Sequence, residues 1–162
     1  MTTKNLTKTA LFAAMIAVMA QISIPIGPVP INFAHVGIFL SAGLLGAKYG
    51  TLSVLTYMLL GLVGIPVFSG LRGGLAVILG PTGGFIIGYL ICSLLTGILG
   101  KNAVAMTIGL IANYLVGVPW LMTVTGMDFV TAMTVGVLPF LVGDSLKIII
   151  SAILVKRLQL HT

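Results

Sequence analysis

The chain has 162 residues, of which 59% are hydrophobic and only 6% are charged. About a quarter of the residues of a soluble domain are charged, so this composition excludes a water-exposed globule and predicts an integral membrane protein. The formal net charge is +6, but most basic residues lie at the ends of apolar segments, which indicates membrane orientation and not a nucleic-acid partner.

Six apolar segments follow one another along the chain, and we expect each to cross the lipid bilayer as a helix. They are residues 6–24, 31–47, 51–67, 81–99, 103–124 and 138–154. About 20 residues of helix span a membrane, and the segments lack the strict alternation of barrel strands. The sequence therefore predicts an all-α integral membrane protein with six transmembrane helices in a single domain, residues 1–162.

The first segment carries a stripe of alanines. Lys4 and Lys8 lie at its start, as they would in a signal peptide, but the segment has nearly full span length and no A-x-A cleavage site, so we expect a retained helix. Its small residues include Ala10, Ala13, Ala14 and Ala17. Alanines four positions apart let another helix approach closely. The stripe either packs within the protein's own bundle or docks another membrane subunit, and the sequence leaves both open.

The basic residues predict the orientation. If the N-terminus is cytoplasmic, six of the eight basic residues fall on the cytoplasmic side, as expected for short loops. These are Lys4, Lys8, Lys48, Lys101, Lys156 and Arg157. We therefore expect both termini in the cytoplasm and outer loops at residues 25–30, 68–80 and 125–137.

The outer loop at residues 68–80 is longer than a turn requires and is rich in glycine. Arg72 lies in it and is followed directly by Gly73 and Gly74. Glycine allows the backbone to approach a ligand closely, and the forked guanidinium of arginine matches a carboxylate. We therefore expect this loop to contribute to a binding site.

The fourth segment begins immediately after this loop. Its first backbone N–H groups, those of Thr82, Gly83 and Gly84, form a candidate anion site at a helix N-terminus. Alternatively, Gly80, Gly84 and Gly88 only allow close helix packing. The two roles are compatible because the helix start and the helix face are different surfaces.

Several polar or aromatic residues lie within the segments. Asn113 is expected near the membrane centre, where an amide needs a partner. Tyr89, Tyr114 and Trp120 could stack on a flat ligand or simply pack. His35 is expected to line a cavity or an interface near the outer end of the second helix.

The chain has only two acidic residues. Asp128 is expected to N-cap a short surface helix in the last outer loop. Asp144 lies three residues before Lys147 in the sixth segment, where charges cost several kcal/mol unless they pair or face a polar cavity. We expect them about 10 and 14 Å below the outer surface, in one outward-open site with Arg72. The alternative is a salt bridge that only holds the last helix in place.

Nothing in the sequence indicates catalysis. Gly100-Lys101 is followed by Asn102, so no Walker phosphate loop is present. His35 and His161 are isolated, which argues against a metal site. We expect a binding protein that is not an enzyme and that needs neither metal nor cofactor.

Four motifs carry a family resemblance. They are I-P-I-G-P-V-P-I at 24–31, G-I-P-V-F-S-G-L-R-G-G-L at 64–75, G-P-T-G-G-F-I-I-G-Y at 80–89 and G-V-L-P-F-L-V-G-D-S-L-K at 136–147. Nearly end to end, the chain resembles the BioY family, the biotin-specific S components of energy-coupling-factor vitamin transporters. It departs at Asn32-Phe33-Ala34, where the family usually has T-L-Q. If that glutamine contacts the ligand in the family, His35 or Asn32 would take its place here.

The resemblance implies a six-helix bundle that captures biotin from outside a bacterial or archaeal cell membrane. It also implies partners, namely a transmembrane coupling subunit and two cytosolic ATPase subunits, with the alanine stripe similar to the docking motif of S components. On this basis Asp144 accepts from the ureido N–H groups of biotin, and Lys147 donates to a ligand oxygen or holds Asp144. The expected substrate-binding residues are Arg72, Gly73, Gly74, Gly83, Gly84, Tyr89, Asn113, Tyr114, Asp144 and Lys147.

Three other functions remain open at this stage. The chain could be an S component for another small vitamin, a small transporter in which Asp144 carries a coupled proton, or a purely structural membrane subunit.

Overall fold

The computed structural model describes residues 2–100 and 102–159. Lys101 and His161 lie outside the described residues. The elements in order are α1 (Thr3–Gln21), β1 (Ser23–Ile24), β2 (Ile31–Asn32), α2 (Ala34–Leu62), α3 (Leu75–Leu79), α4 (Gly83–Leu99), α5 (Ala103–Thr125), α6 (Phe129–Gly136), the short 3-10 helix η1 (Leu138–Phe140) and α7 (Leu141–Gln159). All the long elements are helices, which confirms the predicted fold class.

Helix α2 is interrupted at Gly46, whose φ of 77° and ψ of 178° are not helical. A Cβ atom on Gly50 would lie only 2.6 Å from the Cα of Ala42. Residues eight positions apart in a straight helix are separated by about 12 Å, so the chain must reverse direction here. The second and third predicted segments are therefore the two antiparallel halves of α2.

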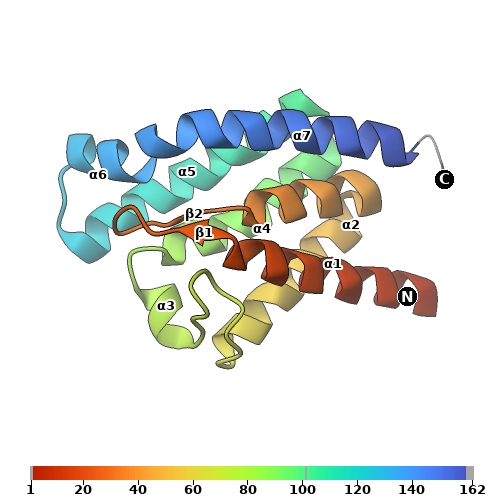
Figure 1. The fold of residues 1–162 in the computed structure, drawn as a ribbon, viewed down its shortest axis with the longest axis horizontal. Helices are drawn as coiled ribbons and strands as arrows, with labels where there is room; N and C mark the ends of the chain where they lie inside the picture. Colours follow the sequence, from red (N-terminus) through yellow and green to blue (C-terminus); the bar gives the residue numbers. More distant parts are fainter. Residues whose placement is uncertain (1, 101, 160–162) are drawn as a thin grey trace.

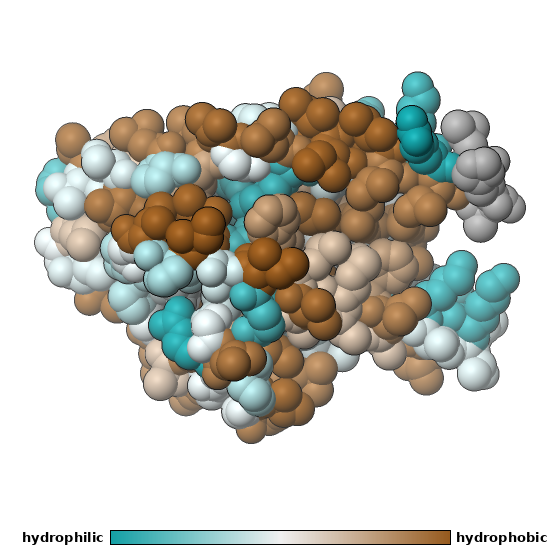
Figure 2. Space-filling view, viewed as in Figure 1, coloured by the Kyte–Doolittle hydropathy of each residue, from teal (hydrophilic) through white to brown (hydrophobic). Residues whose placement is uncertain are grey.

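The six predicted segments correspond to α1, the two halves of α2, α4, α5 and α7. In the part of the chain that is described, three helical stretches are individually long and apolar enough to cross a membrane, namely Ala34–Leu62, Ala103–Thr125 and Phe129–Gln159. Large apolar side chains on the outside, such as Leu11, Leu115 and Ile149, are exposed, as expected for helices that face lipid. Figure 2 shows one such face, which is hydrophobic over most of its area.

A small antiparallel ribbon that the sequence did not predict joins α1 to α2, and in it Ser23 of β1 pairs with Asn32 of β2. The predicted segments 6–24 and 31–47 extended too far because Ile24 and Ile31 are apolar. The intervening prolines at positions 25, 28 and 30 disfavour helix at and before each of them. The chain therefore leaves helix at Gln21 and re-enters it at Ala34.

The ribbon, α3 and α6 lie at one end of the molecule, and both termini lie at the other (Figure 1). Gln159 near the C-terminus donates from Nε2 to the carbonyl oxygen of Gly43 at 3.0 Å, so the reversal in α2 belongs to the terminal end. The terminal end therefore carries the basic residues of the two terminal helices, including Arg157. The other end carries the ribbon and the short helices.

Helix α6 begins where the sequence predicts it. The side chain of Asp128 accepts hydrogen bonds from the backbone N–H groups of Val130 and Thr131, which confirms its N-cap role. The Thr131 hydroxyl also donates to this carboxylate at 2.5 Å. These hydrogen bonds to the charged form, with that of the Thr131 hydroxyl foremost, lower the pKa of Asp128.

Glycines allow the helices to pack closely. A Cβ atom on Gly88 of α4 would overlap the Oδ1 atom of Asn113 in α5, and one on Gly97 would overlap the backbone of Ala47 at the reversal of α2. Gly84 is packed against Trp120 in the same way. Helix α4 is thus held tightly between α5 and α2, and these three helices form the wall behind the pocket described next.

Candidate functional site

A pocket opens between the ribbon, the loop after α2, and helices α2, α4, α5 and α7. The space between its lining residues is about 580 Å³, including the part open to solvent. Five of the ten predicted substrate-binding residues line it: Arg72, Tyr89, Tyr114, Asp144 and Lys147. The pocket therefore gathers residues from distant parts of the sequence into one site.

Asp144 and Lys147 are both buried, with 1% and 4% of their surface exposed. The Nζ atom of Lys147 lies 2.7 Å from Oδ1 of Asp144, so the two residues share one helix face as their spacing predicts. The Tyr114 hydroxyl of α5 donates to the other carboxylate oxygen, Oδ2. The charge of Asp144 is thus satisfied by one donor on each oxygen before any ligand binds.

This group keeps hydrogen-bonding capacity for a ligand. A carboxylate can accept about four hydrogen bonds and an ammonium group can donate three. Lys147 uses one donor on Asp144, and its Nζ atom also lies 5.8 Å from the centre of the exposed Phe33 ring at the start of α2. Both charged side chains line the pocket, where they present an acceptor and a donor side by side.

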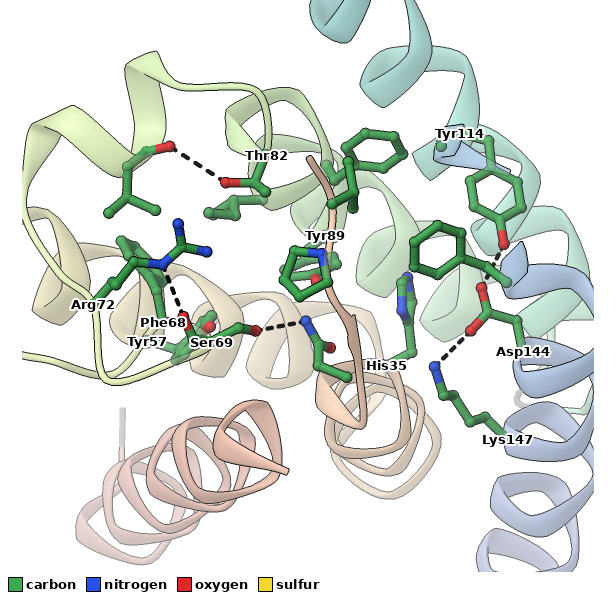
Figure 3. Close-up of a pocket in the computed structure, with 18 residues that line it drawn as sticks. His35, Tyr57, Phe68, Ser69, Arg72, Thr82, Tyr89, Tyr114, Asp144 and Lys147 are labelled. Atoms are coloured by element: carbon green, nitrogen blue, oxygen red, sulfur yellow. Dashed lines mark hydrogen bonds and ion pairs between the residues drawn. The ribbon is translucent and has the colours of Figure 1, made fainter. Parts of the chain in front are cut away.

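Arg72 lies at the opposite side of the pocket, with Tyr89 and His35 between it and Asp144 (Figure 3). Its Nε atom donates to the carbonyl oxygen of Ser69 at 3.0 Å, which leaves the terminal guanidinium N–H groups for a ligand. The backbone of Arg72 pairs with that of Phe68 through two hydrogen bonds of 2.9 and 3.2 Å. The pocket thus has a cation at one side and an ion pair at the other.

The loop that carries Arg72 is fastened to α1 by Gln21. The Nε2 atom of Gln21 donates to the carbonyl oxygens of Val67 and Phe68 at 2.9 and 3.2 Å. Its Oε1 atom accepts from the backbone N–H of Leu71 at 2.9 Å. A single side chain at the end of α1 therefore fixes both sides of this loop.

The four predicted glycines do not line the pocket. Gly73 is packed against the carbonyl oxygen of Ile65, Gly83 against that of Ile78 and Gly84 against Trp120. The backbone N–H of Gly74 donates to the carbonyl oxygen of Gly61 at 2.6 Å. Trp120 also lies outside the lining, and its Nε1 atom donates to the carbonyl oxygen of Gly80 at 3.0 Å. These glycines and Trp120 shape the wall around the pocket.

Asn113 is fully buried and lies behind the pocket, where its Nδ2 atom is 3.1 Å from Nε2 of His35. His35 itself lines the pocket. The nitrogen of this amide thus finds a partner 78 positions away in the sequence, whereas its Oδ1 atom has none among the described residues.

Sequence reasoning missed most of the apolar lining. The missed lining residues include Phe68, Phe85 and Phe140. Tyr57, which the sequence did offer as an aromatic candidate in the third segment, also lines the pocket. Tyr57 and Phe68 contact each other edge to face, with ring centres 5.6 Å apart. Phe68 and Phe85 flank the two glycine blocks, but an aromatic residue in an apolar segment is usually packing, so the sequence offered no signal that singled them out.

The alanine stripe of α1 is divided between two surfaces. Ala13 is buried and Ala17 is half-buried, whereas Ala10 and Ala14 are exposed. The buried side of α1 packs on α2, where a Cβ atom on Gly37 would lie 3.0 Å from Ile16. Packing within the bundle therefore accounts for Ala13, while Ala10 and Ala14 remain available to a partner.

Comparisons with known proteins agree over the whole chain. Residues 1–161 match the model of the BioY family. The chain is 44% identical to the "Probable biotin transporter BioY" of Pyrococcus horikoshii over the full length of both, and 39% identical to the "Biotin transporter BioY" of Thermotoga maritima over 96% of each. A crystal structure of the S-component for biotin from an ECF-type ABC transporter is similar with a TM-score of 0.89 and 35% identity, covering 98% of this chain and 94% of that one.

Proposed function

Because the chain belongs to the BioY family, we propose that it is the membrane subunit that binds biotin for import by an ATP-driven energy-coupling-factor transporter. The observation that carries this function is one pocket with an ion pair at one side, the terminal N–H groups of the Arg72 guanidinium at the other and aromatic rings between them. Biotin has the same order of groups: a polar ureido ring, an apolar sulfur-containing ring fused to it, and a chain that ends in a carboxylate.

The ligand is placed by chemical complementarity. The carboxylate of Asp144 accepts from the ureido N–H side, and the Lys147 ammonium donates to a ligand oxygen or holds Asp144. The bicycle lies against Tyr89 and Tyr114, which both line the pocket. The valerate carboxylate reaches Arg72, since a guanidinium binds a carboxylate with two parallel hydrogen bonds.

Binding of biotin itself is the first test. Isothermal titration of biotin into the detergent-purified protein is expected to give tight, saturable binding with one site per chain. Absence of saturable binding would favour a structural subunit. Uptake by liposomes that contain this chain alone, driven by a pH gradient, would favour the proton-coupled alternative. Tighter binding of a different vitamin would indicate an S component for that vitamin.

Replacing Arg72 with alanine is expected to weaken biotin binding by about tenfold, because the variant loses a charge-assisted hydrogen bond to the valerate carboxylate. A biotin amide, which carries no such charge, should lose much less. Titration of both ligands into both proteins measures the difference. Arg157→Ala, at the terminal end of α7, is the matched control and should leave both affinities unchanged. Equal losses for the two ligands would remove the carboxylate role from Arg72.

We propose that the pocket opens to the outside of a bacterial or archaeal cell membrane and that both termini are cytoplasmic. The support is the location of Lys4, Lys8, Lys156 and Arg157 on the terminal segments of α1 and α7, at the end away from the ribbon (Figure 1). Short cytoplasmic segments are enriched in lysine and arginine.

The proposed partners are a transmembrane coupling subunit and two cytosolic ATPase subunits, which supply the energy for import. We expect this chain to have no enzymatic activity and to require no metal or cofactor. The exposed side of α1, with Ala10 and Ala14, is the proposed docking surface, because small residues let a second helix approach closely.

A further inference from the structure

His35 and Asn113 form a buried polar pair at the wall of the pocket. Asn113 is 0% exposed and His35 is 7% exposed, and Nδ2 of the amide lies 3.1 Å from Nε2 of the imidazole. With the amide nitrogen of Asn113 facing the ring, Nε2 of His35 takes the acceptor role, because an amide nitrogen can only donate. In a neutral imidazole one nitrogen accepts and the other carries the proton. The pair therefore places the proton of His35 on Nδ1.

The position of the His35 ring is fixed by its neighbours. It lies edge-on to Tyr89, with ring centres 5.0 Å apart and planes at 82°. Phe39, one helical turn further along α2, lies 5.8 Å from it at 37°. An imidazole with one nitrogen bonded and two aromatic rings 5.0 and 5.8 Å away cannot turn freely. Its remaining N–H is thus preorganised, which reduces the entropy lost when a ligand binds.

Asn32, the other polar residue near the start of α2 that lines the pocket, already uses its side chain in two hydrogen bonds within the protein. Its Nδ2 atom donates to the Ser69 hydroxyl at 2.7 Å, and its Oδ1 atom accepts from the backbone N–H of Ala34 at 3.0 Å. The bond to Ser69 joins the ribbon to the loop that carries Arg72. By contrast, Nδ1 of His35 has no hydrogen-bond partner among the described residues, and the side chain lines the pocket.

We propose that His35 is a specificity-determining residue that donates from Nδ1–H to the ureido oxygen of biotin, and that Asn113 is the positioning residue that sets the tautomer. This inference rests on the proposed function. Asp144 then accepts from the N–H side of the urea, and His35 donates to its oxygen. The pocket would thereby select a cyclic urea over a ring that has a weaker acceptor at that position.

Three ligands separate this role from a shape effect. Biotin and desthiobiotin both have the ureido oxygen, whereas 2-thiobiotin has sulfur, a weaker acceptor, in its place. His35→Phe is expected to reduce the affinity for biotin and desthiobiotin by roughly tenfold or more, because a buried donor is lost, and to change that for 2-thiobiotin much less. His35→Gln, whose amide can still donate, should recover part of the biotin affinity. Equal losses for all three ligands would overturn the inference.

The second experiment measures the tautomer of His35 with the pocket unaltered, so it does not depend on the folding of a His35 variant. Nitrogen-15 labelling of histidine in a His161→Gln chain leaves one imidazole, and NMR of its two ring nitrogens should show the neutral Nδ1–H form. Asn113→Ala should shift it toward a mixture of tautomers and weaken biotin more than 2-thiobiotin. A signal from the Nε2–H form in the otherwise unaltered site would overturn the inference. A protein that binds none of the three ligands would overturn the proposed function, and this inference with it.

Discussion

Replacing Asp144 with asparagine is expected to reduce biotin affinity by about 100-fold or more. The substitution removes the charged acceptor proposed for the ureido N–H groups and leaves the buried Lys147 ammonium, now 2.7 Å from Asp144, without a counter-charge. Loss of one partner of a buried charge pair costs about 2–5 kcal/mol. Isothermal titration of biotin into the purified variant measures the effect, and an unchanged affinity would exclude Asp144 from the site.

The chain supplies a matched control, because its only other acidic residue is Asp128. That carboxylate is exposed and caps α6, and asparagine is an equally good N-cap. Asp128→Asn should therefore leave biotin affinity unchanged. The double variant Asp144→Asn with Lys147→Met tests whether Asp144 acts only through the lysine. If the double variant recovers biotin binding, Asp144 only neutralises Lys147; if binding stays weak, Asp144 contacts the ligand.

Placing a methyl group at Gly97 is expected to lower the stability of the fold clearly. A Cβ atom there would overlap the backbone of Ala47 and lie 2.9 Å from the carbonyl carbon of Gly46. Backbone atoms cannot rotate aside, so α4 must move away from the reversal of α2. Overpacking of this kind typically costs about 1–3 kcal/mol, which corresponds to a fall in Tm of several degrees at about 2–4 °C per kcal/mol.

The control for Gly97→Ala is Gly143→Ala in α7, where a Cβ atom meets nothing within 4 Å. Alanine is the better helix former by about 1 kcal/mol, so this variant should melt at the same temperature as the parent or slightly above it. Thermal unfolding in one detergent, with and without biotin, compares the two. Equal Tm values for both alanine variants would show that the close approach at Gly97 is not required.

The charged residues of the site could be recognised from the sequence, through their charge and their helical spacing. Asp144, Lys147 and Arg72 stood out because a charge in or beside an apolar segment needs a reason, and all three line one pocket. Asn113 was recognised as an amide in need of a partner. Its pairing with His35, 78 positions away, depends on how α2 and α5 pack, which no local pattern specifies.

The glycines were harder to interpret. Gly83 and Gly84 suit a helix N-terminus that binds an anion, but the same residues suit close packing, and the structure places them against Ile78 and Trp120. A glycine matters because another group can occupy the space of the missing side chain. Its role therefore depends on which residue packs there, and the motif does not specify that residue. The ribbon between α1 and α2 was missed for a related reason, since its isoleucines are as apolar as those of the helices beside them.

The hydrogen bonds of Gln21 make the end of α1 and the arginine loop a single mechanical unit. One amide holds the carbonyl oxygens of Val67 and Phe68 and the N–H of Leu71. If α1 slides along its axis or tilts, it must either break these bonds or carry the backbone next to Arg72 with it. A movement of α1 would therefore also displace the backbone beside Arg72, the proposed partner of the valerate carboxylate.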